Sequence, residues 1–265
     1  MLAEVAPEGR VAAGCTNILP DIRSKKITGC TLVDISGLEE LKGIRVAGNT
    51  VTIGSLATIS ELIHADLIAS HGRVLWQAGR YFADPLVRNR ATIAGNLANA
   101  SPAADGVVPL LALDAKVMVE SLSGAREIPV AEFFAGPGKS VLQPDELITD
   151  ISFMKTTNMK SAFIKFGLRK SMAISLASIG LVLELDSNVI TQVRIALGAL
   201  APTPVRARLT EDYLTGKQLS PEVLARAQEL VATEVQPISD VRASREYRLH
   251  LTGVLLKRAI EAAVA

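Results

Sequence analysis

Two short segments of the chain combine small residues with threonine and asparagine, a pattern that suits close contact between the backbone and a phosphate-bearing ligand. The first reads Val-Ala-Ala-Gly-Cys-Thr-Asn-Ile over residues 11–18 and predicts a strand that turns through glycine into the start of a helix. Backbone N–H groups at such a turn are unpaired and can bind phosphate oxygens. The side chains of Thr16 and Asn17 can add hydrogen bonds to a charged group, worth roughly 1.5–3 kcal/mol each. A plain helix N-terminus is the other interpretation of this segment.

The second segment reads Thr-Ile-Ala-Gly-Asn over residues 92–96 and continues through small residues and amides to Asp105. Gly95 permits close approach of the backbone to a ligand, and Thr92 and Asn96 offer polar groups. Asp105 could accept hydrogen bonds from ribityl or ribose hydroxyls. The alternative is a surface loop in which glycine serves only the turn geometry. Together the two segments suggest a nucleotide cradle.

The side-chain groups that usually carry catalysis are missing from the sequence. None of the three histidines falls in a metal-ligand spacing or a nucleophile motif. The chain has no Gly-x-Ser-x-Gly, no Walker lysine loop and no Gly-x-Gly-x-x-Gly fingerprint. Two cysteines, Cys15 and Cys30, are too few for a disulfide framework or a four-thiolate iron–sulfur cluster. We therefore assign no catalytic and no metal-binding residue, and expect a bound cofactor to supply any reactivity.

Composition excludes several classes of protein. A length of 265 residues with 49% apolar residues is enough for two lobes with a large core. The net charge of +1 gives no field that would attract nucleic acid or an anionic membrane. No apolar run approaches the ~20 residues of a membrane span, and no secretion signal is visible, so we expect a cytoplasmic protein. The mean hydropathy of +0.31 indicates either a large core or a face covered by a partner subunit.

The predicted order of strands and helices changes near residue 155. Through about residue 120 short strands alternate with helices. From residue 147 on, four successive strands are predicted, the last three of them after residue 155, and two helices follow, with a hairpin turn at Asp186-Ser187-Asn188. The glycine- and proline-containing stretch at 134–144 predicts a long surface loop. The C-terminal part is therefore expected to be an α+β lobe.

At these segments the sequence resembles a known family. Residues 88–105 resemble the TIGGN-x-ANASPAAD signature of the FAD-binding subunits of the xanthine dehydrogenase and carbon monoxide dehydrogenase family, and residues 11–18 are similar to that family's AGGT-(D/N)-L loop. Further similar stretches follow in the family's order at 110–115, 165–170, 198–206 and 247–258. The resemblance therefore covers nearly the whole chain.

The resemblance implies an α+β fold in two parts. Residues 1–155 would form a two-lobed FAD-binding domain of the vanillyl-alcohol-oxidase-like (PCMH) type, with subdomains at about 1–55 and 56–155. Residues 156–265 would form a C-terminal domain of the CO dehydrogenase flavoprotein type. The residues that the two segments and the resemblance together assign to FAD binding are Val11, Ala12, Ala13, Gly14, Cys15, Thr16, Asn17, Ile18, Phe82, Thr92, Ile93, Ala94, Gly95, Asn96, Asp105, Ile148 and Lys165.

Within this set the resemblance implies different roles. Residues 11–18 and 92–96 would wrap the diphosphate and the adjacent sugar, and Asp105 matches an FAD-contacting aspartate. Ile148 falls where the family has a leucine against the flavin, and Phe82 matches an aromatic position of some members. Lys165 matches a lysine near the isoalloxazine end, with a solvated strand lysine as the alternative.

Three departures from the family pattern bear on cofactor binding. Cys15 stands at the second glycine of the first segment and Ala94 at the first glycine of the second, and a positive φ at either position would carry strain. The family's N-terminal strand and helix are largely absent before residue 11, so a partner could complete the adenine end.

The function implied by the resemblance is that of an electron relay in an oxidoreductase complex. A large subunit with a molybdopterin cofactor would hydroxylate the substrate, and a small subunit with [2Fe–2S] clusters would pass electrons to FAD in this chain. An external acceptor such as NAD would then receive them. Two alternatives are a stand-alone FAD oxidoreductase and a flavin-free structural subunit of the same complex.

Overall fold

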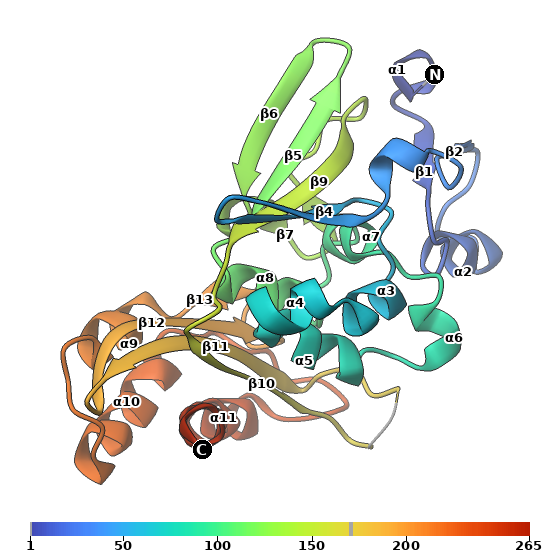
Figure 1. The fold of residues 1–265 in the computed structure, drawn as a ribbon. Coiled ribbons are helices and arrows are strands. Elements are labelled where there is room, and N and C mark those ends of the chain that lie inside the picture. The colour runs from blue at the N-terminus through green and yellow to red at the C-terminus, as the bar shows by residue number, and fades with distance from the viewer. Residues whose placement is uncertain (1, 170–171) are drawn as a thin grey trace.

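The computed structural model describes residues 2–169 and 172–265, which form an α+β fold with sheets and helices in alternating layers (Figure 1). Lys170, the last residue of one family-like stretch, lies outside the described residues. In Figure 1 a five-stranded sheet lies above a group of helices, a four-stranded sheet lies below them, and the last three helices cover the far face of that sheet. The expected α+β fold class is confirmed.

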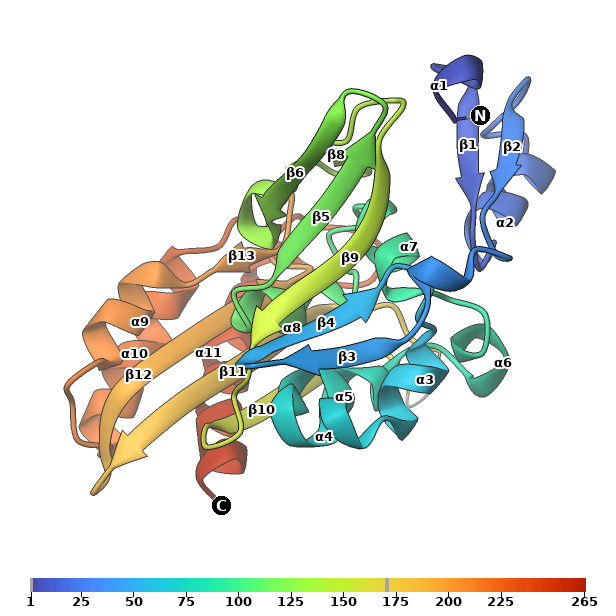
Figure 2. The same cartoon turned by 45° about the horizontal axis from the view of Figure 1, so that its top comes forward.

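The N-terminal unit stands beside the five-stranded sheet, as Figure 2 shows. Its two strands pair in parallel, which requires a crossover, and a short helix supplies it. Val33 and Ile35 pack against Leu41 and Leu56 in a small core. The elements of this unit are α1 (Leu2–Val5), β1 (Gly9–Ala12), α2 (Ile18–Arg23), β2 (Thr31–Asp34) and the 3-10 helix η1 (Glu39–Leu41).

The five-stranded sheet is antiparallel throughout, in the order β3-β4-β9-β5-β6. Its strands are β3 (Ile44–Ala47), β4 (Thr50–Gly54), β9 (Leu147–Met154), β5 (Lys116–Ser121) and β6 (Gly124–Pro129). The helices beneath it are α3 (Ile59–His64), α4 (Asp66–His71), α5 (Arg73–Tyr81), α6 (Pro85–Arg88), α7 (Ile93–Ala98) and α8 (Val107–Ala112). Thr58 and Glu61 form a capping box at the start of α3, which satisfies N–H groups that a helix start leaves unpaired.

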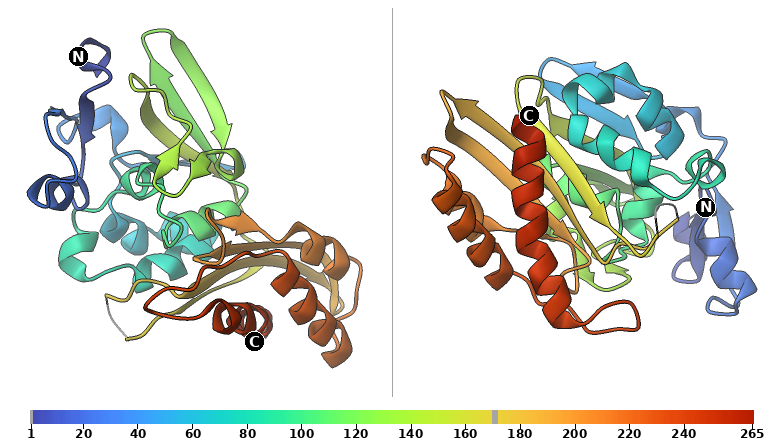
Figure 3. Two further views of the ribbon diagram at one scale, coloured as in Figure 1. Left: turned by 180° about the vertical axis from the view of Figure 1, so that it is seen from behind. Right: turned by 90° about the horizontal axis from the view of Figure 1, so that it is seen from below.

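The four-stranded sheet comprises β10 (Lys160–Phe166), β11 (Ala177–Asp186), β12 (Val189–Gly198) and β13 (Val205–Arg206), antiparallel and in that order. Helices α9 (Arg208–Leu214), α10 (Pro221–Thr233) and α11 (Arg245–Val264) pack on one face, and Figure 3 shows α11 running across it. Side chains alternate between the two faces of a strand. Phe163 and Val182 accordingly point to the other face, where they join the core formed with α5 and α8.

A buried arginine links the helices that flank the four-stranded sheet. Arg206 donates to the backbone oxygen of Leu111 at 3.1 Å, at the end of α8, and pairs with Asp114 in the same turn. Its other nitrogens bind both oxygens of Glu211 on α9, at 2.6 and 2.8 Å. The bidentate geometry matches the fixed fork of the guanidinium group. Two of the family-like stretches, 110–115 and 198–206, are therefore held together by the contacts of Arg206.

Two expectations from the sequence need correction. Residues 134–144 are not a plain loop, because β7 (Phe134–Gly136) and β8 (Lys139–Ser140) form a small antiparallel pair there. The segment that begins at Thr92, for which a surface loop was one of the two interpretations, forms α7 and buries Ile93 and Leu97 completely. These two residues are spaced four apart and share one helix face, which suffices for a helix this short.

Candidate functional site

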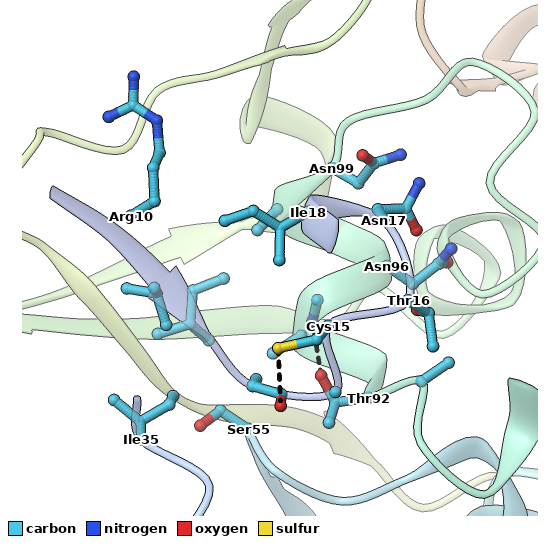
Figure 4. A pocket seen from close by; sticks show the side chains of 18 of the residues that line it. Arg10, Cys15, Thr16, Asn17, Ile18, Ile35, Ser55, Thr92, Asn96 and Asn99 are labelled. Atoms are coloured by element: carbon cyan, nitrogen blue, oxygen red, sulfur yellow. Dashed lines mark hydrogen bonds between the residues drawn. The ribbon is translucent and has the colours of Figure 1, made fainter. Parts of the chain in front are cut away.

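A pocket of about 410 Å³ opens where the N-terminal unit meets the helices beneath the five-stranded sheet (Figure 4). Both candidate segments line it, although they lie about 80 residues apart in the sequence. The volume is within the range of about 300–1,000 Å³ that is usual for cofactor pockets.

Gly14 allows the two segments to touch. A Cβ atom added to it would lie 1.8 Å from the backbone oxygen of Arg90, immediately before the second segment. No side chain fits at that distance, so the contact between the segments requires glycine here. This close approach, rather than a left-handed backbone, is the reason for glycine at this position.

Cys15 follows with a φ of +63°, in the left-handed region that favours glycine. Its thiol donates to the backbone oxygen of Ala13 at 3.6 Å. The strain expected for a positive φ is therefore present at Cys15. It is absent at Ala94, which lies in the first turn of α7 with an ordinary helical φ.

The second segment is the capped start of α7. The Thr92 hydroxyl accepts from the backbone N–H of Gly95 at 3.0 Å, and the backbone N–H of Ile93 donates to Ala57 at 3.1 Å. The Asn96 side-chain oxygen accepts from the N–H of Gly106 at 3.0 Å, which fixes the chain that follows the helix. A Cβ at Gly95 would first meet the Thr92 hydroxyl, at 2.8 Å, so a larger residue would disturb this cap.

The structure brings most of the sequence-derived site residues to this pocket. Those that line it are Val11, Ala13, Gly14, Cys15, Thr16, Asn17, Ile18, Phe82, Thr92, Ala94, Gly95, Asn96 and Ile148. Ala12 and Ile93 lie beside them in the chain with buried side chains, 5% and 0% exposed. Asp105 and Lys165 are outside the pocket lining.

Asp105 and Lys165 bind each other instead. The Lys165 ammonium lies 2.5 Å from one carboxylate oxygen of Asp105, and the Ser175 hydroxyl donates to the other at 2.6 Å. The Lys165 and Asp105 side chains are only 8% and 11% exposed, so the alternative of a solvated strand lysine is wrong. Burial raises the pKa of Asp105 above its ordinary value, and the charge of Lys165 opposes that rise. The pair ties the end of the second segment to β10.

Several lining residues were not expected from the sequence. They are Arg10, Asp21, Ile27, Ile35, Ser55, Ala91, Ala98, Asn99, Gly138, Leu142, Glu146 and Leu147. Asn99 falls inside the family-like signature and could have been found there. Glu146 is held by a bidentate ion pair with Arg126 at 2.6 and 2.8 Å, which holds the pKa of Glu146 below its ordinary value. Most of the others reach the pocket only through tertiary structure, and no local signal marks them.

The pocket has a polar side and an apolar side. Hydroxyls and amides of Thr16, Asn17, Thr92, Asn96 and Asn99 gather on the polar side, which suits a diphosphate and its sugars. The apolar side, which suits a planar ring, is formed by Ile27, Ile35, Leu142, Leu147 and Ile148. This combination fits a dinucleotide. Among residues 2–169 and 172–265 no group of three His, Cys, Asp or Glu side chains could hold a metal ion.

Comparison with protein families identifies the chain. Residues 1–153 match the FAD binding domain in molybdopterin dehydrogenase, and residues 162–263 match the CO dehydrogenase flavoprotein C-terminal domain. The chain belongs to the molybdopterin dehydrogenase FAD-binding family. It is thus an FAD-binding subunit of the molybdenum hydroxylase type, and a component of an oxidoreductase.

Individual relatives match this molybdopterin dehydrogenase FAD-binding chain over nearly its whole length. The xanthine dehydrogenase FAD-binding subunit of Escherichia coli O157:H7 is 34% identical, over 98% of this chain and 90% of that protein. The carbon monoxide dehydrogenase medium chain of Hydrogenophaga pseudoflava is 30% identical, over 100% of this chain and 92% of the relative. The solved structure of the Hydrogenophaga pseudoflava carbon monoxide dehydrogenase superposes with a TM-score of 0.96 at 29% identity, covering 99% of this chain and 92% of that one.

Within the part of the chain that the structure describes, no helix is both long and apolar enough to cross a bilayer.

Proposed function

We propose that this FAD-binding chain is the electron relay of a molybdenum hydroxylase complex. In this proposal electrons enter from the [2Fe–2S] clusters of a small partner subunit and leave to an external acceptor such as NAD. The observation that carries the proposal is the pocket itself, where two small-residue segments meet around a space with one polar and one apolar side. FAD, when bound there, would supply redox chemistry that no side chain of the pocket can supply.

The chain's own residues would bind and orient the cofactor. Gly14 lets the first segment lie against the second, so that amides and hydroxyls of both face one space. Asn17, Asn96 and Asn99 would hold the diphosphate and sugars through hydrogen bonds from uncharged side chains. Ile35 and Ile148 would pack against a ring and exclude water from it.

Partner subunits are proposed from the relatives. The Hydrogenophaga pseudoflava relative is named a medium chain, and the matching solved enzyme is described as lacking the Mo-pyranopterin moiety of its molybdenum cofactor. A large molybdopterin subunit and a small [2Fe–2S] subunit would accordingly accompany this chain.

A stand-alone flavin oxidoreductase is less well supported. Such an enzyme needs an acid or base beside the flavin to act on its own substrate. The three histidines, His64, His71 and His250, all lie outside the pocket lining. The two acids that do line the pocket are already paired, Glu146 with Arg126 and Asp21 with Lys26.

The visible spectrum of the purified complex tests the proposal first. We expect flavin absorbance together with iron–sulfur absorbance, and FAD at about one per chain when the released cofactor is separated by chromatography. Intact partner subunits with no flavin would overturn the relay and leave a structural subunit. The acceptor is tested separately: NADH mixed anaerobically with the complex should bleach the flavin band if NAD is the acceptor, whereas an unchanged band would exclude NAD.

A further inference from the structure

Ser55, directly after β4, carries a hydroxyl group without a hydrogen-bond partner among the described residues. The residue is 3% exposed and lines the pocket, where Figure 4 shows it beside Ile35. A hydroxyl group removed from water normally has a partner, because burial costs it the hydrogen bonds that water supplied. An unpartnered hydroxyl in the wall of a ligand pocket therefore points to a group on the ligand.

The backbone around Ser55 holds this side chain in place. The N–H of Ser55 donates to Thr149 at 2.9 Å, and the next N–H, of Leu56, donates to Leu41 at 2.9 Å. The preceding residue, Gly54, packs closely on the backbone of Leu41, because an added Cβ would lie 2.4 Å from the Leu41 backbone oxygen. The backbone cannot carry the Ser55 side chain away from the pocket without breaking these contacts.

The hydroxyl is also not needed for packing. Alanine has nearly the same volume as serine and would satisfy an apolar wall beside Ile35 and Ile148 without an unpaired polar atom. Ser175 illustrates the usual case, because it is buried and donates to Asp105 at 2.6 Å. Within the pocket wall, Ser55 instead offers an unused donor and acceptor amid apolar side chains.

We propose that the Ser55 hydroxyl forms a hydrogen bond to FAD and thereby positions the cofactor in the apolar part of the pocket. The partner would be a ring nitrogen or an oxygen of the dinucleotide. The inference rests on the proposed function, because it takes FAD as the occupant. It adds a positioning residue that lies outside both small-residue segments and completes its hydrogen bonding only when the cofactor is present.

A matched pair of variants tests this role. Ser161 also has a buried hydroxyl without a partner among the described residues, but it does not line the pocket. The full chain, with the subunits that accompany it, would be freed of flavin and titrated with FAD while quenching of flavin fluorescence is followed. For Ser55→Ala we expect a Kd about five- to tenfold higher than for the unsubstituted protein, the usual effect of one lost hydrogen bond. For Ser161→Ala the Kd should not change.

Thermal unfolding supplies a second readout. Without FAD, Ser55→Ala should melt no lower than the unsubstituted protein, because an unpaired polar atom has been removed. With FAD, its rise in Tm should be smaller, because the stabilisation by a ligand falls with its affinity. Equal FAD affinity of Ser55→Ala and the unsubstituted protein would overturn the inference. Failure of the unsubstituted protein to bind FAD would instead overturn the proposed function.

Discussion

Residues 11–18 and residues 92–99 line the same pocket, yet they are held in different ways. The second segment is fixed by its own hydrogen bonds, from the Thr92 cap to the bond between Asn96 and Gly106. The first has no side-chain cap at Asn17 and contains the left-handed Cys15. Its first two residues pair with β2, and beyond them the segment rests on the close packing of Gly14 on Arg90. The second segment is thus a preformed support, and the first depends on it.

The largest effect is expected for Lys165→Met, because Lys165 pairs with Asp105 at the far end of the second segment. The change would leave the Asp105 carboxylate buried without its cation, at a cost of about 3–5 kcal/mol in the free energy of unfolding at neutral pH. Because burial raises the pKa of Asp105, and loss of Lys165 raises it further, the protonated form is favoured in the folded state. The loss should therefore be small below about pH 3.8, where Asp105 is protonated in both states, and grow as the pH rises.

Chemical denaturation at several pH values measures this difference. Lys160→Met is the control on the same strand, because Lys160 is exposed and donates to the backbone oxygen of Val264. It should change the free energy of unfolding by no more than about 0.5 kcal/mol. A loss for Lys165→Met that is equally large at acid and neutral pH would contradict a buried charge as its cause.

Gly14→Ala should break the contact between the segments. The new methyl group would overlap the backbone oxygen of Arg90, so one segment must move, at a cost of about 3 kcal/mol in stability. Because the first segment is the dependent one, we expect FAD affinity to fall by more than about 100-fold while the second segment keeps its structure. Gly37→Ala is the control, since nothing lies within 4 Å of a Cβ there. Near-normal flavin content of Gly14→Ala would show that the contact is dispensable.

Thr92→Ala should have a moderate effect, because it removes the cap of a preformed support. Loss of an N-cap hydroxyl costs about 1 kcal/mol, and Thr92→Ser should restore most of it. Thr58→Ala removes a comparable cap on α3 outside the pocket lining. Denaturation should give similar losses for both alanine variants, but flavin titration should show weaker binding only for Thr92→Ala. Weakened binding in both variants would mean that general stability, not the cap, controls affinity.

The smallest effect is expected for Cys15→Gly, and it should be a gain. A left-handed conformation costs a non-glycine residue about 1–2 kcal/mol, and the extra freedom of glycine in the unfolded chain offsets about 0.5–1 kcal/mol of this. The net increase in the free energy of unfolding should be about 0.5–1 kcal/mol, with FAD affinity kept. Cys15→Ala retains the strain and should show no gain. A loss of stability in Cys15→Gly would mean that the thiol contributes more through its contact with Ala13 than the strain costs.

The sequence correctly predicted local features, which depend on residues close together in the chain. The glycine turn of the first segment, between β1 and α2, depends on side chains within a few positions of it. The family resemblance supported Asp105 and added Lys165 to the candidates. The ion pair between them could not be predicted, because 60 residues separate them and each residue by itself suggested a contact with the ligand.

The features that the sequence did not predict depend mainly on tertiary structure. Ile27, Ile35 and Ser55 reach the pocket because the N-terminal unit stands beside the five-stranded sheet. Helix α7 was missed because its small residues show no apolar period beyond Ile93 and Leu97. The pair of β7 and β8 has only three and two residues per strand, too few for an alternating pattern to be recognised.

The packing of α5 and α8 against the four-stranded sheet joins the two family matches through a shared buried face. The matches meet between residues 153 and 162, and each has a buried cluster largely its own, but the cluster of the first match also contains residues of the second. Phe163 and Val182, from the second match, lie in the same cluster as Ile53 and Leu110, from the first. A chain cut at this junction would expose part of that cluster on both fragments. We therefore expect the two matched stretches to unfold together rather than as two independent units.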